Sequence, residues 1–175
     1  VYGEDPTINR LEALAAERVG KEAAMLVVSG TMGNLCALLA HCARGDEVLV
    51  GDLSHIYNYE AGGASVLGGV AFHVVPTLPN GELPLDELAA AVRHADDSHE
   101  ALTRLICLEN THNRCGGVAL APEYLGAVQA FARERGLRVH LDGARLFNAA
   151  VAQGTDACSI TAHVDSVQFC LSKGL

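Results

Sequence analysis

The stretch Ser166-Val167-Gln168-Phe169-Cys170-Leu171-Ser172-Lys173-Gly174-Leu175 joins an apolar run to a charged group at the carboxyl end of the chain. The run at 166–171 predicts a short buried strand, so Lys173 should emerge just past the end of a strand. A similar run at 138–141 leads directly into Asp142. Because the carboxyl ends of parallel strands share one edge of a sheet, the amine and the carboxylate are expected to face the same crevice.

Short apolar runs alternate with helical stretches along the whole chain. The expected strands are 23–28, 47–50, 71–75, 104–108, 138–141 and 166–171, and the expected helices are 30–42, 56–67, 86–94, 122–135 and 144–152. Strands of four to six apolar residues that alternate with helices are typical of a parallel sheet buried on both faces. The predicted fold class is therefore α/β, a mostly parallel sheet with helices on both faces.

Composition excludes several classes of partner. The net charge of the 175 residues is −9, without a basic run, so nucleic acid and anionic membranes are not expected to bind. No apolar run approaches the roughly 20 residues that span a bilayer. Six cysteines without a CxxC pair predict free thiols in a reducing compartment, the cytosol or an organelle matrix such as that of mitochondria. The histidines show no metal-ligand spacing, so no metal site is predicted.

Polar clusters follow the expected strands, where a parallel sheet binds its ligands. The first, Ser29-Gly30-Thr31, could hold a phosphate with free amides and a helix dipole, or could be an ordinary helix cap. His55 and His112 follow at later strand ends. Each imidazole could stack on a flat cofactor ring or act as a base, and each could equally be a loop histidine with backbone partners.

A carboxylate such as Asp142 at the end of a buried strand needs a partner that offsets its desolvation. A pyridinium N–H would serve, and the alternative is a local ion pair with Arg145. Lys173 could form a Schiff base with pyridoxal phosphate or be a surface lysine at the sheet edge. Together with Ser29, Gly30 and Thr31, these groups predict a site for pyridoxal phosphate.

Several long motifs resemble the low-specificity L-threonine aldolases, pyridoxal-phosphate enzymes of fold type I in the β-eliminating lyase superfamily. The resemblance covers essentially the whole chain. Its pieces are Val1-Tyr2-Gly3-Glu4-Asp5-Pro6-Thr7, the 29–34 loop, Leu108-Glu109-Asn110-Thr111-His112-Asn113, His140-Leu141-Asp142-Gly143-Ala144-Arg145-Leu146-Phe147-Asn148 and Phe169-Cys170-Leu171-Ser172-Lys173-Gly174-Leu175. The last three motifs are long and specific.

The resemblance implies a role for each candidate. Lys173 would bind the cofactor covalently, Asp142 would pair with its ring nitrogen, and His55 would lie against the ring. Arg145 would reach both the cofactor's phenolic oxygen and the substrate carboxylate. The phosphate would be held by Ser29, Gly30 and Thr31.

The implied reaction is retro-aldol cleavage of L-threonine or L-allo-threonine to glycine and acetaldehyde, a step of threonine catabolism and glycine biosynthesis. His112 would lie near the substrate hydroxyl, while Tyr2 and Tyr59 would line the site, partly across a subunit boundary. The base that takes the hydroxyl proton stays open between His55, His112 and water. Members of the family are dimers or tetramers, so a homo-oligomer is expected.

The resemblance also implies that residues 1–175 are an incomplete pyridoxal-phosphate-binding large domain. An amino-terminal segment and a carboxyl-terminal small domain would be absent, so the chain is expected to be truncated at both ends. Two alternatives follow: a catalytically silent, truncated aldolase-like chain, or another pyridoxal-phosphate enzyme that catalyses β-elimination or transamination. A dinucleotide-binding domain is a distant third, because the chain lacks GxGxxG.

Overall fold

A five-stranded parallel sheet organises the chain. The computed structural model describes residues 3–94 and 96–174. The strands are β1 (Glu47–Gly51), β2 (Ala71–Val75), β3 (Thr103–Glu109), β4 (Arg138–Asp142) and β5 (Ser166–Gln168). They are hydrogen-bonded in the order β2-β1-β3-β4-β5, and every neighbouring pair is parallel. The mostly parallel sheet predicted from the apolar runs is confirmed.

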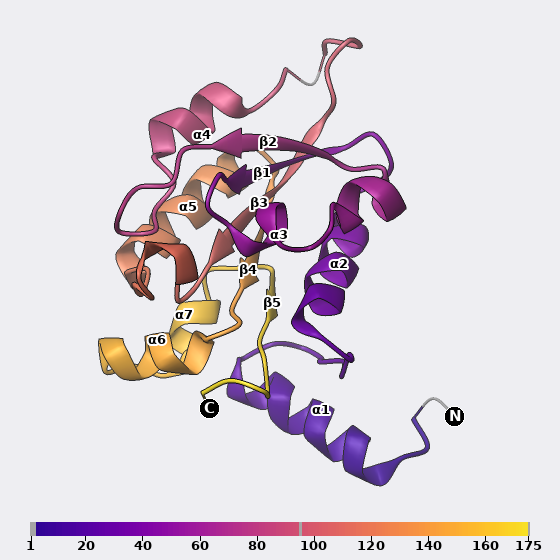
Figure 1. Ribbon diagram of the computed structural model, residues 1–175, viewed down its shortest axis with the longest axis vertical. Coiled ribbons are helices and arrows are strands. Elements are labelled where there is room, and N and C mark those ends of the chain that lie inside the picture. Colours follow the sequence, from indigo (N-terminus) through magenta and orange to yellow (C-terminus); the bar gives the residue numbers. More distant parts are fainter. Residues whose placement is uncertain (1–2, 95, 175) are drawn as a thin grey trace.

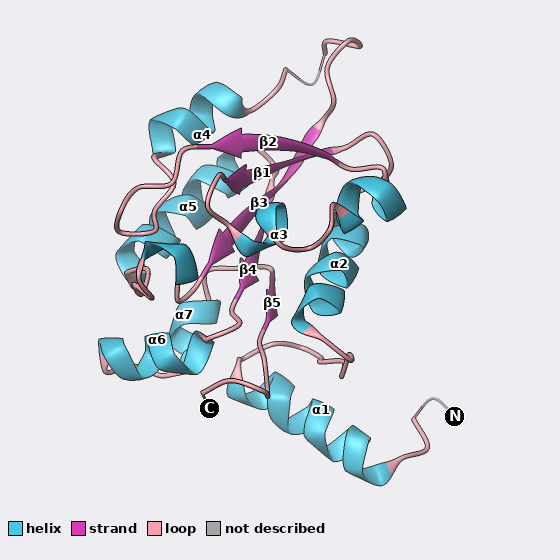
Figure 2. Cartoon of the chain, viewed as in Figure 1, coloured by secondary structure: helices cyan, strands magenta, loops and turns pink. Residues whose placement is uncertain are grey.

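Helices cover both faces of this sheet (Figure 1, Figure 2). In chain order the helical elements are α1 (Pro6–Arg18), α2 (Gly30–His41), α3 (His55–Asn58), η1 (Ala64–Gly68), α4 (Leu85–Ala91), η2 (Asn113–Cys115), α5 (Pro122–Glu134), α6 (Leu146–Gln153) and α7 (Ala157–Thr161). None of them, over the residues described, is long and apolar enough to cross a bilayer.

Alternation along each strand divides the core in two, because successive side chains of a strand point to opposite faces. Val48 and Val50 of β1 pack with Leu38 of α2, together with α3 and η1. Leu49 points the other way, into the larger cluster with α4 and α5. A strand that is buried on both faces needs no polar positions, which explains the continuous apolar runs.

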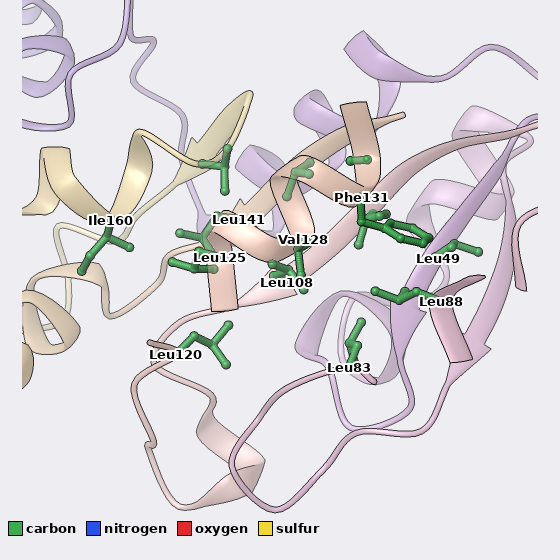
Figure 3. Packing of buried hydrophobic residues seen from close by; sticks show 14 of the residues in the cluster. Leu49, Leu83, Leu88, Leu108, Leu120, Leu125, Val128, Phe131, Leu141 and Ile160 are labelled. Carbon is green, nitrogen blue, oxygen red and sulfur yellow. The ribbon is translucent and has the colours of Figure 1, made fainter. Parts of the chain in front are cut away.

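The larger core lies between the sheet and α5 (Figure 3). Leu125 and Val128 of α5 are three residues apart on one helix face and are fully buried together with Leu108 and Leu141 of the strands. The helix begins with Pro122 at its first turn, and Gly136 follows its end with φ +68°. Both ends agree with the predicted helix at 122–135.

Three expectations about the elements are wrong, and two helices were missed. Residues 23–28 form no strand, and their apolar side chains include Val28, which is 93% exposed. The last strand, expected at 166–171, stops at Gln168 because its ladder partner β4 ends opposite it at Asp142. The helix expected at 56–67 is broken into α3 and η1. Helices α1 and α7 were not expected, and both begin at an aspartate that caps the first turn.

Candidate active site

The first turn of α2 carries the Ser29-Gly30-Thr31 cluster. Ser29 caps the helix, because its Oγ accepts a hydrogen bond from the Met32 amide at 3.1 Å. The amides of Gly30 and Thr31 have no acceptor among the residues that the structure describes. The turn is therefore a helix cap that still offers two free N–H groups to an anion.

A cleft of about 380 Å³ lies beside this turn, between α1, residues 21–30 and the segment 167–172. Ser29 and Gly30 line it, whereas His55 and Asp142 do not. The glycine also allows close packing, because a Cβ on Gly30 would lie 3.0 Å from Cys170 Sγ.

Asp142 ends β4 and is 2% exposed. Its carboxylate accepts hydrogen bonds from Asn34 Nδ2 at 2.9 Å and from the Ala144 amide at 3.1 Å. Burial, and then the negative charge of Glu109, raise the pKa of this carboxyl to about 6, although the Asn34 bond opposes the rise. Asp142 makes no ion pair with Arg145 within the described ranges, so the local pair considered from the sequence does not form.

His55 lies against a second buried carboxylate. Its Nδ1 is 3.0 Å from Glu60 Oε1, and its amide donates to Glu109 Oε2 at 2.8 Å. One polar atom each from His55, Glu60 and Asp142 lies within 4.8 Å of the others. The half-exposed Tyr59 ring is 5.6 Å from the His55 ring. The structure thus brings together His55, Asp142 and Tyr59, as expected of one site.

His112 is buried at the same edge of the sheet, just beyond β3. Its backbone pairs with Val118, and Asn110, two residues before it, donates its amide to the Asp142 carbonyl at 2.8 Å. Neither ring nitrogen of His112 has a hydrogen-bond partner in the described part of the chain. A buried imidazole with two unused nitrogens is costly unless another group binds it.

Among the residues described, Lys173 forms no hydrogen bond or ion pair with this cluster. It lies five residues past the end of β5, is exposed, and places its Nζ 3.2 Å from Cys170 Sγ. The next residue, Gly174, lies against Asn148 of α6. The expectation that Lys173 emerges directly at a strand end is wrong, because β5 is shorter than its apolar run. Tyr2 lies outside the described residues.

Three site residues were missed from the sequence, namely Asn34, Glu60 and Glu109. Glu109 belongs to a strand-end cluster and was given no role, yet its carboxylate accepts the amides of both His55 and Asn113. Asn34 is a buried polar residue of α2, and its place in the 29–34 loop was the available signal, although it was given no role there. Nothing in the sequence marks Glu60, which follows Tyr59, the C-cap residue of α3.

Pyridoxal phosphate fits the groups that are present. Its pyridinium would supply the cationic partner that Asp142 lacks among the described residues, and its phosphate suits the free amides of α2. Arg145 is half-buried, and its guanidinium has no partner in the described ranges, so it is available to an anionic group.

The sequence profile of the family described as Beta-eliminating lyase matches residues 1–175. The chain belongs to this family. It is 51% identical over 175 residues to the low specificity L-threonine aldolase of Escherichia coli K12, covering 100% of this chain and 51% of that protein. Identity is also 51%, over 177 residues, to the probable low-specificity L-threonine aldolase 2 of Arabidopsis thaliana, with 100% and 50% covered. The chain spans about half the length of these relatives.

The solved threonine aldolase of Leishmania major has a similar structure. It superimposes with a TM-score of 0.82 at 25% sequence identity, over 94% of this chain and 48% of that chain. This likeness confirms the predicted fold class, the α/β fold of the fold-type I enzymes. The roles predicted for individual residues remain predictions.

Proposed function

We propose that the complete protein cleaves the Cα–Cβ bond of L-threonine or L-allo-threonine to give glycine and acetaldehyde, with pyridoxal phosphate as cofactor. The observation that carries the proposal is Asp142, a buried carboxylate without a cationic partner in the described residues, next to His55 at the carboxyl edge of a parallel sheet. The names of the relatives support the choice of reaction.

Each group has a task toward the cofactor. Pyridoxal phosphate, when bound, supplies a protonated pyridine ring that withdraws electrons from the substrate Cα. Asp142 would hold that proton at the ring nitrogen, and His55, oriented by Glu60, would lie against the ring. Lys173 would bind the cofactor covalently. The free backbone amides of Gly30 and Thr31, beside the cap residue Ser29, would donate hydrogen bonds to the phosphate.

The substrate would be held by its carboxylate at Arg145, with Tyr59, and Tyr2 as predicted from the sequence, lining the site. The β-hydroxyl proton passes to a base, the Cα–Cβ bond breaks, acetaldehyde leaves, and Cα regains a proton to give glycine. The two free nitrogens of buried His112 support it as the base, while His55, held at Nδ1 by Glu60, is assigned to the ring.

A second candidate is β-elimination, which the description of the family favours. The same Asp142 and Lys173 would serve both reactions. Product analysis separates them: aldol cleavage of threonine gives glycine and acetaldehyde, whereas elimination gives a keto acid and ammonia.

Lysine chemistry offers a sharp test, because the chain has only two lysines, Lys21 and Lys173. Lys21 donates to the carbonyls of Thr161 and Val164, at 2.7 and 2.5 Å, and is thereby occupied. The purified protein is incubated with pyridoxal phosphate, reduced with borohydride and mapped by mass spectrometry. We expect the pyridoxyl group on Lys173, with an absorbance band that Lys173→Arg abolishes and Lys21→Arg preserves.

Labelling of Lys21, or equal labelling of both lysines, would contradict the assigned site. Acetaldehyde release from threonine, lost in Lys173→Arg, then tests the reaction itself. A band that depends on Lys173 without any release would support the catalytically silent alternative.

The proposal extends to assembly and location. We infer a homo-oligomer, dimer or tetramer, because large apolar side chains such as Met25, Val28 and Val66 are exposed. Sedimentation of the protein should show a dimer or tetramer. The cytosol or an organelle matrix is the proposed compartment, since all six cysteines are free.

A further inference from the structure

A continuous chain of hydrogen bonds crosses from the far end of α2 to Asp142. His41 Nε2 lies 2.7 Å from Ser166 Oγ, and Ser166 Oγ lies 2.8 Å from His140 Nδ1. His140 Nε2 lies 3.0 Å from Asn34 Oδ1, and Asn34 Nδ2 donates to Asp142 at 2.9 Å. All four contacts have ordinary hydrogen-bond lengths.

The fold explains why these side chains meet. Asn34 and His41 are seven residues apart on α2, which is two turns, so both lie on the helix face toward β4 and β5. His140 and Ser166 are partners in the register of β4 and β5. Helix α2 therefore supplies His41 and Asn34, and the neighbouring strands β4 and β5 supply the other members, including Asp142 at the end.

The donors and acceptors fix a single direction. Asn34 Nδ2 also donates to Glu60 Oε1 at 2.8 Å, so its amide nitrogen faces two carboxylates and its oxygen faces His140. His140 is completely buried, and burial lowers its pKa to about 3, so the ring is neutral and has one N–H. That proton must be on Nε2, because an amide oxygen only accepts.

The remaining protons follow from the neutral ring. His140 Nδ1 must accept, so the Ser166 hydroxyl donates to it. That hydroxyl has a single proton, so the His41 Nε2–H donates to Ser166 Oγ. Every donor therefore points along the chain toward Asp142.

We propose that His41, Ser166, His140 and Asn34 form a one-way hydrogen-bond chain that aims the Asn34 amide at Asp142 and keeps this carboxylate ionised. They are positioning residues, because they act through Asp142. The proposal rests on the proposed function for its purpose, since an ionised Asp142 is what a protonated cofactor ring requires.

The backbone amide of Ala144 also donates to Asp142 and favours its ionised form, but the other side chains around Asp142 oppose this effect or leave it unchanged. Glu109 on β3 and Glu60 beyond α3 are negative and raise its pKa. His55 on α3 is paired with Glu60, and the facing residue of β5 is the neutral Gln168. Among the side chains described, Asn34 is the one that donates a hydrogen bond to Asp142. The orientation of the Asn34 amide therefore decides whether the side-chain hydrogen bond that favours the ionised form of Asp142 is made.

The test uses magnetic resonance on the protein without cofactor. Imidazole nitrogen shifts should show His140 neutral, with its proton on Nε2 and none on Nδ1. Carboxyl carbon shifts should show the pKa of Asp142 rising by about one unit in Ser166→Ala, since a hydrogen bond to a charged group is weakened. Ser166→Thr keeps a hydroxyl and should restore the original value.

Ser65→Ala is the matched control, because the Ser65 hydroxyl donates to the Val70 carbonyl, outside the chain. An unchanged pKa of Asp142 in Ser166→Ala, or a proton on His140 Nδ1 in the unaltered protein, would overturn the inference. The second measurement needs no variant and so does not depend on the folding of Ser166→Ala.

In the loaded protein, Ser166→Ala should lower kcat several-fold with KM little changed, because Asp142 does not touch the substrate. The proposed function fails separately. Absence of Lys173 labelling, with the His140 proton and the pKa of Asp142 as expected, would reject the cofactor site and leave the hydrogen-bond chain standing.

Discussion

Three carboxylates share the site, and in the described part of the chain none of them is paired with a lysine or arginine. Glu109 and Asp142 are direct partners in the register of β3 and β4. Glu109 is satisfied by the amides of His55 and Asn113, while Glu60 and Asp142 share the two protons of the Asn34 amide. Hydrogen-bond donors, in place of cations, stabilise these three carboxylates, so their negative charge stays available to a cationic ligand.

Glu109→Gln should lower the pKa of Asp142, because the negative charge of Glu109 raises it. The carboxyl carbon shift of Asp142, followed across pH, measures this change. Glu123→Gln, on the first turn of α5, is the matched control and should leave the value in place. Glu109→Gln also replaces one of the two oxygens of Glu109 that accept hydrogen bonds by a donor, so we expect the unfolding free energy of this variant to fall by about 1–3 kcal/mol. A pKa of Asp142 that stays at about 6 would show that burial alone sets it.

At the scale of single residues, sequence motifs predict which residues lie near the site, but they do not predict the contacts that only the fold creates. His55 and Asp142 follow apolar strands, and the structure brings them together. Asn34 and Glu60 are 26 residues apart and meet because α2 packs beside the break after α3. No local pattern encodes that meeting.

Helix α2 approaches β5 unusually closely, and glycine makes this possible. A Cβ on Gly33 would lie 2.6 Å from Gln168 Cγ, which is closer than packed carbon atoms tolerate. The close approach keeps the first turn of α2, with its free amides, beside the sheet edge. This packing reason for the glycine was not foreseen, since the 29–34 loop suggested phosphate binding or an ordinary helix cap.

Gly33→Ala should destabilise the protein by about 1–3 kcal/mol, because the gain in helix propensity is outweighed by overpacking. Gly126→Ala is the matched control within α5. There the new Cβ would lie 3.6 Å from His163 Cε1, an ordinary contact, so we expect stabilisation of about 0.5–1 kcal/mol. Urea unfolding of both variants measures the two free energies. If the two substitutions shift the midpoint in the same direction, α2 is free to move away from β5.

Strands with two buried faces were predicted well from their apolar residues. Elements whose structure depends on strand pairing or on a helix cap were not. β1, β3 and β4 are largely apolar because both of their faces are covered, so their positions follow from composition. The edge strand β2 is only partly buried, yet its apolar residues still mark its position. Residues 23–28 are equally apolar, yet no strand pairs with them and Val28 is exposed. Helix α1 is amphipathic but polar on average, and the cap at Asp5 is its most specific signal. Strand pairing and capping depend on partners that hydrophobicity does not reveal.

On the scale of the whole molecule, the buried titratable groups link folding to pH in opposite directions. The pKa of Asp142 is raised to about 6 in the folded state, above the ordinary value near 4. Its contribution to stability is complete below that ordinary value and is lost as pH rises through 6. His140 has a pKa lowered to about 3, so its contribution is present above about 6.5 and is lost as pH falls.

Asp142→Asn isolates the first of these effects. The unfolding free energy of the variant minus that of the unaltered protein should increase between pH 4.5 and 8 by about 2–3 kcal/mol, because only the unaltered protein must ionise a buried carboxyl. His140 is present in both proteins, so its contribution cancels in the difference. Urea unfolding at four or five pH values measures this slope, whatever constant penalty the new amide introduces.

Asp165→Asn provides a comparison of opposite sign. Burial raises the pKa of Asp165, but the Val139 amide and Arg138 outweigh it and hold that pKa below its ordinary value. Its stabilisation is present above about pH 4 and is lost in acid, so this variant should be most destabilised at neutral pH. The two variants should therefore diverge as pH rises. Parallel dependences of the two unfolding free energies on pH would mean that Asp142 is solvated or paired in solution. The cofactor site would then lack the buried, unpaired carboxylate on which it depends.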